Sequence, residues 1–290
     1  MSSSALLLVI AAAIAHASWN LLAKRAAHVG SPFVFAYGLC CTIVYAPWVV
    51  WVLVFEQNEW SWPIVGCIAL SGALHLAYSL CLQRGYQLAD LSVVYPIARG
   101  TGPMLSTVGA LLLLGEPATV RGISGMLCVV AGVLLIATQG KLGRLMQPAA
   151  MVGVRWGALV GAFIAAYTLV DAYGVKTLLI APVVFDWATC ATRTVLLLPH
   201  TARQPRQAWA AMKGYWPLAW GIGVLSPLGY ILVLYALQGG APVSLVAPAR
   251  EMSMLLVTLA GLYLLREPVG WGRLVGCCGI ALGVVLLAGS

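Results

Sequence analysis

Residues 99–117 read RGTGPMLSTVGALLLLGEP, and residues 250–268 read REMSMLLVTLAGLYLLREP. The two stretches begin with Arg99 and Arg250 and both end on Glu-Pro, at a constant separation of 151 residues. Further along, the same separation relates Gly125 to Gly276 and Gly132 to Gly283. Shared leucines mean little in an apolar chain, but a shared Arg, a shared Glu-Pro and two shared glycines indicate an internal duplication.

The composition places the chain in a bilayer. Of its 290 residues, 62% are hydrophobic and 8% are charged, whereas an ordinary soluble domain has about 25% charged residues. Such a chain has too few charges to cover a water-facing surface. This argues against a soluble domain, a disordered chain and a disulfide-stapled secreted module. We therefore expect an all-α integral membrane protein.

Ten apolar runs, five in each half, approach the length of about 20 residues that crosses a bilayer. They lie at about 5–23, 33–55, 62–82, 91–114, 122–138, 156–175, 180–198, 216–236, 243–265 and 270–288. An odd number of spans per half places the second repeat upside down. Secondary transporters commonly have such inverted repeats, with the substrate site near the midplane. The expected division is a first repeat over 1–140, a linker loop over 141–155 and a second repeat over 156–290.

The 16 Lys and Arg residues exceed the 8 Asp and Glu residues, for a net charge of +8. Most basic residues stand singly in short gaps between apolar runs, which is typical of topology signals and not of a nucleic-acid interface. They gather after every second span, beginning with the first, so the positive-inside rule predicts that both termini face outward. No cleavable signal peptide is evident, because the first run lacks a basic segment before it.

Several ionisable residues fall inside the expected spans, where a charge is costly and by default marks function. They are His75, Arg99, Asp171, Asp186, Arg193, Arg250 and Glu251. Some of these side chains have a structural alternative, which is to reach the interface or to pair with one another. Arg99 and Arg250 lie deep in their spans at equivalent repeat positions, so we expect them to act in substrate binding or gating.

Polar and aromatic residues are spaced to share helix faces with these groups. His75 and Tyr78 are three residues apart, and His16 and Asn20 are four apart, as are their repeat counterparts Tyr167 and Asp171. This recurrence predicts a cavity, although each aromatic side chain could instead pack between helices or lie at the membrane interface. The predicted substrate-binding residues are Trp19, Asn20, His75, Tyr78, Tyr95, Arg99, Tyr167, Asp171, Arg250 and Glu251.

Small residues and prolines complete the pattern. Glycines recur at three- to four-residue spacing in the spans at 122–138 and 270–288, which favours close helix packing as a scaffold or as a dimer face. Pro96 and Pro103 in one span, and Pro242 and Pro248 near the start of another, allow kinks in helices that move.

Over essentially its whole length the chain resembles the EamA-type ten-span members of the drug/metabolite transporter superfamily. The residues that resemble this family run from Pro103 through Glu116-Pro117 to Gly132, with their copy ending at Gly283. The Trp19-Asn20 pair and Arg193 also look similar to family positions. The resemblance implies a secondary carrier with a central cavity and cytoplasmic termini, similar to the bacterial exporters of amino acids, including aromatic ones. The small four-span multidrug members have a carboxylate where this chain has Asn20, so their antiport of cationic drugs is not implied.

We therefore expect a multi-pass protein of the cytoplasmic membrane that exports small polar metabolites, above all amino acids. Arg binds carboxylate or phosphate in a bidentate way, so an uptake carrier for an anionic, carboxylate or phosphonate-type compound is the alternative. An intramembrane enzyme or a channel is a distant alternative, because no HExxH pattern, carboxylate pair or filter motif occurs. The expected partners are a small-molecule substrate, the lipid bilayer and a coupling proton or ion, with no cofactor, metal or nucleic acid. The protein is expected to be a monomer or a homodimer.

Overall fold

The computed structural model describes residues 2–56, 60–141, 143, 147–256, 258 and 270–289, and these residues form helices and no strands. Three 3-10 or short α-helical elements, η1 (Ala27–Val29), η3 (Pro148–Ala150) and α8 (Pro205–Ala211), join longer helices. The longer helices are α1 (Ser3–Arg25), α2 (Ser31–Phe55), α3 (Trp62–Leu88), α4 (Leu91–Leu113), α5 (Val120–Thr138), α6 (Met151–Lys176), α7 (Pro182–Ala202), α9 (Trp216–Gln238) and α12 (Trp271–Ala288), with the shorter α10 (Val243–Ala249) before the last. The all-α prediction is confirmed for the described residues.

Seven of the described helices are long and apolar enough to cross a membrane, namely α1, α2, α3, α5, α6, α9 and α12. Two more predicted spans are helical as α4 and α7, which contain Arg99, Asp186 and Arg193. The predicted span 243–265 begins with α10 and lies partly outside the described residues, as does the second Glu-Pro copy at Glu267-Pro268. The helix α6 begins at Met151, ahead of the expected 156, because the apolar residues 151–154 extend it.

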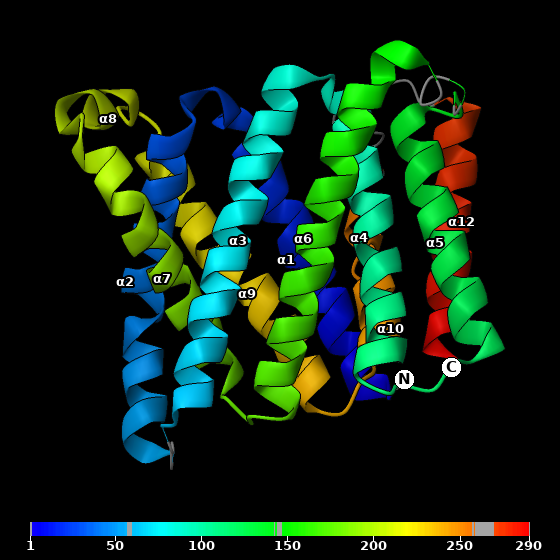
Figure 1. Cartoon of the computed structure of the whole chain (residues 1–290), viewed down its shortest axis with the longest axis horizontal. Coiled ribbons are helices and arrows are strands. Elements are labelled where there is room, and N and C mark those ends of the chain that lie inside the picture. Colours follow the sequence, from blue (N-terminus) through cyan, green and yellow to red (C-terminus); the bar gives the residue numbers. More distant parts are fainter. Residues whose placement is uncertain are drawn as a thin grey trace.

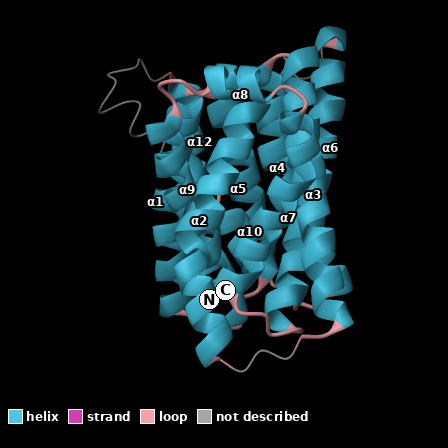
Figure 2. Cartoon of the chain, turned by 90° about the vertical axis from the view of Figure 1, so that its left-hand side faces the viewer, coloured by secondary structure: helices cyan, strands magenta, loops and turns pink. Residues whose placement is uncertain are grey.

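The helices run side by side from one end of the molecule to the other, and both chain termini lie at the same end (Figures 1 and 2). We call this the terminal end, and the opposite end, which holds η1, α8 and η3, the α8 end. Helices from the two halves of the chain contact each other throughout. The main cross-half contacts are α5 with α12, α4 with α6, α1 with α9, α3 with α6, α2 with α7, α2 with α9 and α3 with α7.

Glycines hold α5 and α12 against each other. A methyl group on Gly132 would lie 2.6 Å from the carbonyl oxygen of Gly276, and one on Gly125 would lie 2.9 Å from that of Gly283. Because only hydrogen at these positions lets the two backbones approach, the glycine stripes are used within the chain. They form an internal scaffold. In this packing the same glycines face each other between α5 and α12 and do not form a dimer face.

We expect Gly132→Ala to lower the free energy of unfolding by about 1–3 kcal/mol, since the added methyl group overpacks the contact between α5 and α12. Gly66→Ala is the matched control, because Gly66 lies in the exposed part of α3 and a methyl group there meets no atom within 4 Å. Thermal unfolding of the detergent-purified variants measures both. Equal melting temperatures for the two variants would contradict the packing argument.

The chain breaks its helix in the middle of the bundle, directly after Pro248. The helix α10 ends at Ala249, Arg250 and Glu251 form a turn, and helical residues resume at Met252. Pro248 has no N–H to donate to the Ser244 carbonyl, and the Thr107 hydroxyl donates to that oxygen instead, at 3.3 Å. Irregular backbone at membrane depth is tolerated where it is buried in protein or lines a cavity.

Basic residues gather at the α8 end. Helix ends and loops place there Arg25, Arg84, Lys141, Arg155, Arg203, Arg206, Lys213 and Arg273. Arg121 and Lys176 lie instead at the ends of α5 and α6 near the terminal end. The charge asymmetry that the sequence indicates is therefore an asymmetry between the two ends of the folded bundle.

Candidate functional site

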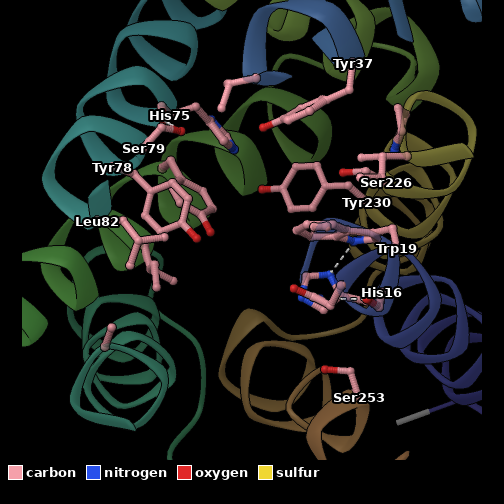
Figure 3. Close-up of a pocket in the computed structure, with 18 of the residues that line it drawn as sticks. His16, Trp19, Tyr37, His75, Tyr78, Ser79, Leu82, Ser226, Tyr230 and Ser253 are labelled. Atoms are coloured by element: carbon pink, nitrogen blue, oxygen red, sulfur yellow. Dashed lines mark hydrogen bonds between the residues drawn. The ribbon is translucent and has the colours of Figure 1, made fainter. Parts of the chain in front are cut away.

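The bundle encloses a cavity of about 640 Å³, bounded by helices from both halves of the chain. Its lining on α1, α3 and α4 comes from residues 16–23, 75–86 and 95–99, which are the parts of these helices toward the α8 end. On α7 the lining comes from residues 186–193, in the half nearer the terminal end, so the cavity spans the middle of the bundle and reaches toward the α8 end along α1, α3 and α4. In Figure 3, Tyr37, Tyr230 and Trp19 face the same space as His75 and Tyr78.

Stacked and edge-on rings form one wall of the cavity. The His75 ring stacks on that of Tyr167 with centroids 4.0 Å apart, and Tyr78 meets Tyr167 edge-on at 5.7 Å. Tyr230 of α9 contacts both His75 and Tyr167 edge-on. The wall thus joins α3, α6 and α9 and offers an apolar, polarizable surface with hydroxyl and imidazole groups.

The C-terminal half of α1 forms the facing wall. The Trp19 indole N–H donates to His16 Nδ1 at 3.2 Å, and the Asn20 amide donates to the His16 carbonyl at 2.7 Å. These bonds orient the indole ring and leave the carbonyl oxygen of the Asn20 side chain available as an acceptor.

The two repeat-related arginines have different surroundings. Arg99 Nε lies 2.8 Å from Glu251 Oε2, and its Nη2 donates to the Ser253 hydroxyl at 3.3 Å. Neither Nε has a hydrogen-bond partner in the described part of the chain, so the two arginines differ in their ion pairs. Arg250 lines the cavity and is 6% exposed. No carboxylate of the described residues forms an ion pair with it. The repeat explains this difference, because Gly100 stands where an equivalent of Glu251 would pair with Arg250.

Eight of the ten predicted site residues line the cavity: Trp19, Asn20, His75, Tyr78, Tyr95, Arg99, Tyr167 and Arg250. Glu251 is 1% exposed and lies behind the wall, paired to Arg99. Asp171 is fully buried and accepts hydrogen bonds from Ser71 and Tyr230. Asp171 follows Tyr167 by one helical turn toward the terminal end, which places it beyond the cavity.

The structure adds lining residues that the sequence argument left out of the site. Tyr37 and Tyr230 belong to helices without an internal charge, and their only sequence signal is an aromatic residue within an apolar run. Asp186 and Arg193, two turns apart on α7, both line the cavity. The Arg193 guanidinium lies over the Tyr37 ring, 5.7 Å from its centroid, a favourable position for a cation.

A carboxylate closes the bundle at the terminal end. Glu116, after α4, accepts the backbone N–H of Val243 at 2.6 Å and that of Ser244 at 2.9 Å. Lys176 at the end of α6 donates to the same carboxylate at 3.4 Å. Buried apolar side chains, among them Phe185 and Leu237, fill the layer between this network and the cavity.

Glu116→Ala is expected to destabilise the protein by about 1–3 kcal/mol, because it leaves buried N–H groups at the start of α10 without an acceptor. Asp90→Ala is the matched control, since Asp90 precedes α4 but its exposed side chain makes no capping bond. Melting temperatures in detergent compare the two variants. If Asp90→Ala lowers the melting temperature as much as Glu116→Ala does, the Glu116 network is not the source of the effect.

A bundle of apolar helices around a polar and aromatic internal cavity is an arrangement that membrane transporters of small molecules use. The chain belongs to the EamA-like transporter family, whose model matches residues 3–138 and 151–289. Membership in this drug/metabolite transporter family indicates a multi-pass membrane transporter and not an enzyme.

Two relatives and one solved structure are similar to the chain. The "Multidrug resistance protein EbrB" of Bacillus atrophaeus is 36% identical over 78 residues, and its namesake in Bacillus subtilis (strain 168) is 35% identical over 78 residues. Each match spans 26% of this chain and 62% of the relative. A protein described only as "Crystal structure of protein" is 19% identical, with a TM-score of 0.73, and the match covers 99% of this chain and 98% of that one. This last similarity concerns the fold.

Proposed function

We propose that the protein is a secondary transporter that exports amino acids across the cytoplasmic membrane by alternating access around the central cavity. The observation that supports this best is the cation of Arg250, buried at the cavity without a carboxylate partner among the described residues. An uncompensated buried charge is costly, and a substrate carboxylate would balance it through a bidentate contact.

The rest of the cavity suits the other parts of an amino acid. Asp186 lines the same cavity with the opposite charge, so both charges of a zwitterion have a counterpart there. The rings of Tyr78, Tyr167 and Tyr230 offer an apolar surface for a side chain, an aromatic one included. The volume of about 640 Å³ is within the range of ordinary small-molecule sites.

The proposed architecture is ten spans in two inverted repeats, over 1–140 and 156–290 with a linker at 141–155. Contacts between helices support it, because they occur in repeat-related pairs. If α1, α2, α3 and α5 correspond to α6, α7, α9 and α12, then α1 with α9 corresponds to α6 with α3, and α2 with α9 to α7 with α3. The contacts of Gly125 with Gly283 and of Gly132 with Gly276 exchange in the same way. Two such halves rocking against each other would expose the cavity alternately to each side.

An uptake carrier for an anionic, carboxylate or phosphonate-type compound is the second candidate. Arg193 and Arg250 line the cavity against one lining carboxylate, Asp186, which favours a substrate with net negative charge. The similar proteins from Bacillus are named for multidrug resistance, but a cationic drug would face an excess of positive charge in this cavity.

Counterflow in liposomes distinguishes these candidates. Purified protein is reconstituted into liposomes loaded with one unlabelled compound, and entry of the labelled compound is followed for a panel of amino acids, organic acids, a phosphonate and a cationic dye. Exchange of amino acids supports the first proposal, and exchange of the anions alone supports the second. Exchange of the dye alone would contradict both.

The orientation of the chain in the membrane decides to which side of the membrane the cavity is open in this conformation. The positive-inside rule predicts that the basic α8 end faces the cytoplasm, whereas the family resemblance implies cytoplasmic termini. Both termini lie at the end opposite α8, so if the cavity opens at the α8 end, an external C-terminus would mean a cavity open to the cytoplasm. A reporter fused to the C-terminus of the full chain, active on one side of the membrane, separates the two predictions.

A further inference from the structure

Asp171 belongs to a buried cluster next to the cavity and not to its lining. Ser71 of α3 donates to its Oδ1 at 2.6 Å, and the Tyr230 hydroxyl of α9 donates to its Oδ2. His75 Nε2 lies 3.8 Å from Oδ2, and the carboxylate itself is fully buried. We propose that Asp171, reached through His75, is the site that binds the coupling proton of this transporter. The proposal rests on the transport function inferred above.

The hydrogen bond of His75 Nδ1 turns the other ring nitrogen toward the Asp171 carboxylate, 3.8 Å away. Its Nδ1 lies 3.0 Å from the Ser71 carbonyl oxygen, which accepts but cannot donate. In the neutral ring Nδ1 is therefore the N–H donor, and Nε2 is an acceptor that faces a carboxylate oxygen. Two acceptors face each other in this way unless one of them holds a proton. The pair is thus built to bind one proton, either on the imidazole or on the carboxyl group.

The surroundings of Asp171 favour a proton over a metal cation or a substrate ammonium. Each carboxylate oxygen already accepts a hydrogen bond from a hydroxyl group, so the carboxylate is partly satisfied without a cation. No Lys or Arg of the described residues forms an ion pair with Asp171. The polar, titratable and charged groups of the neighbouring helices are Cys67, Ser71 and His75 on α3, Asp186, Thr189 and Arg193 on α7, Tyr230 on α9, and Arg250 after α10. Ser71 and Tyr230 donate directly to the carboxylate, and His75 is the imidazole that faces it, 3.8 Å away.

The Asp171 cluster is connected both to the cavity and to helices of the two halves of the chain. His75 and Tyr230 line the cavity, so a proton that enters with water reaches His75 Nε2. Transfer from Nε2 to Oδ2 requires the 3.8 Å between them to shorten to hydrogen-bond distance or a bridging water, and it leaves a neutral imidazole and a neutral carboxyl group. The bonds to Ser71 and Tyr230 join α3, α6 and α9. Protonation of Asp171 therefore changes hydrogen bonds between helices of the two halves, next to rings that line the substrate cavity.

Transport assays with Asp171→Asn test the coupling role. Liposomes that contain the variant are assayed for exchange of labelled L-phenylalanine and for its accumulation driven by a pH gradient. We expect exchange to persist and accumulation to fall to the equilibrium level. Asp90→Asn, the removal of an exposed carboxylate, is the matched control and is expected to retain both. Accumulation by Asp171→Asn, or loss of exchange as well as accumulation in a folded variant, would overturn the proposal.

A second readout does not depend on transport. Infrared difference spectra of the purified protein between acidic and alkaline buffers detect carboxyl protonation, and we expect one pH-dependent band to be missing in Asp171→Asn. If the wild type exchanges no L-phenylalanine, the choice of substrate has failed, and this band still decides whether Asp171 binds a proton. If Asp171→Asn does not fold, Tyr230→Phe replaces it, and the band is expected to shift because a donor to Oδ2 is lost. A band that neither variant changes would overturn the assignment.

Discussion

Arg250→Gln is expected to weaken binding of a carboxylate substrate by about 2–5 kcal/mol, which is roughly 30-fold or more. The wild-type cation is buried at the cavity, and its Nε has no partner among the described residues. A substrate carboxylate therefore gains a charge-assisted contact without displacing an internal one. The neutral amide keeps a polar group of smaller size and loses both the charge and the bidentate geometry. The substrate concentration for half-maximal counterflow measures the effect.

Two further variants make this result interpretable. Arg250→Lys keeps the charge and loses the planar fork, so it should fall between the wild type and Arg250→Gln. Arg84→Gln removes a guanidinium that is exposed and bonded to Gln87, outside the cavity lining, and should leave the half-maximal concentration unchanged. If Arg250→Gln binds carboxylate substrates as tightly as the wild type, Arg250 is not the carboxylate site.

Glu251→Gln is expected to destabilise the fold by about 3–5 kcal/mol, because it leaves the Arg99 cation buried without its counter-charge. Arg99 Nε and Glu251 Oε2 are 2.8 Å apart, with side chains that are 13% and 1% exposed. The pair joins α4 to the broken helix after α10, so its loss also loosens the backbone around Arg250. Thermal unfolding of the detergent-purified variant measures the change in stability.

The double variant Arg99→Gln/Glu251→Gln distinguishes the cost of leaving one buried charge unpaired from the cost of losing the contact itself. Removing both charges leaves no uncompensated ion, so most of the stability lost in Glu251→Gln should return. A double variant that is less stable than either single variant would show that the two side chains act independently. It would then contradict the view that Glu251 exists to neutralise Arg99.

The sequence predicted the class of the protein and much of the cavity wall. The scarcity of charged residues and the length of the apolar runs place the chain in a lipid bilayer, and both can be read directly from the sequence. Polar residues such as His75 and Tyr78 stand out in an apolar helix because three residues separate them along one face. Repetition at a constant separation strengthened the choice of Tyr167, Arg99 and Arg250. All five of these residues line the cavity.

Only the tertiary structure divided these residues into roles. Arg99 and Arg250 are 151 residues apart at equivalent sequence positions, yet Glu251 neutralises the first, whereas Gly100 stands at the equivalent position and the second has no carboxylate partner among the described residues. Asp171 shares a face with Tyr167, but the cavity ends one turn earlier and the carboxylate is sealed by Ser71 and Tyr230. Helical spacing determines the direction in which a side chain points. Which neighbour meets it, and how deep the cavity reaches, depend on packing between helices far apart in the chain.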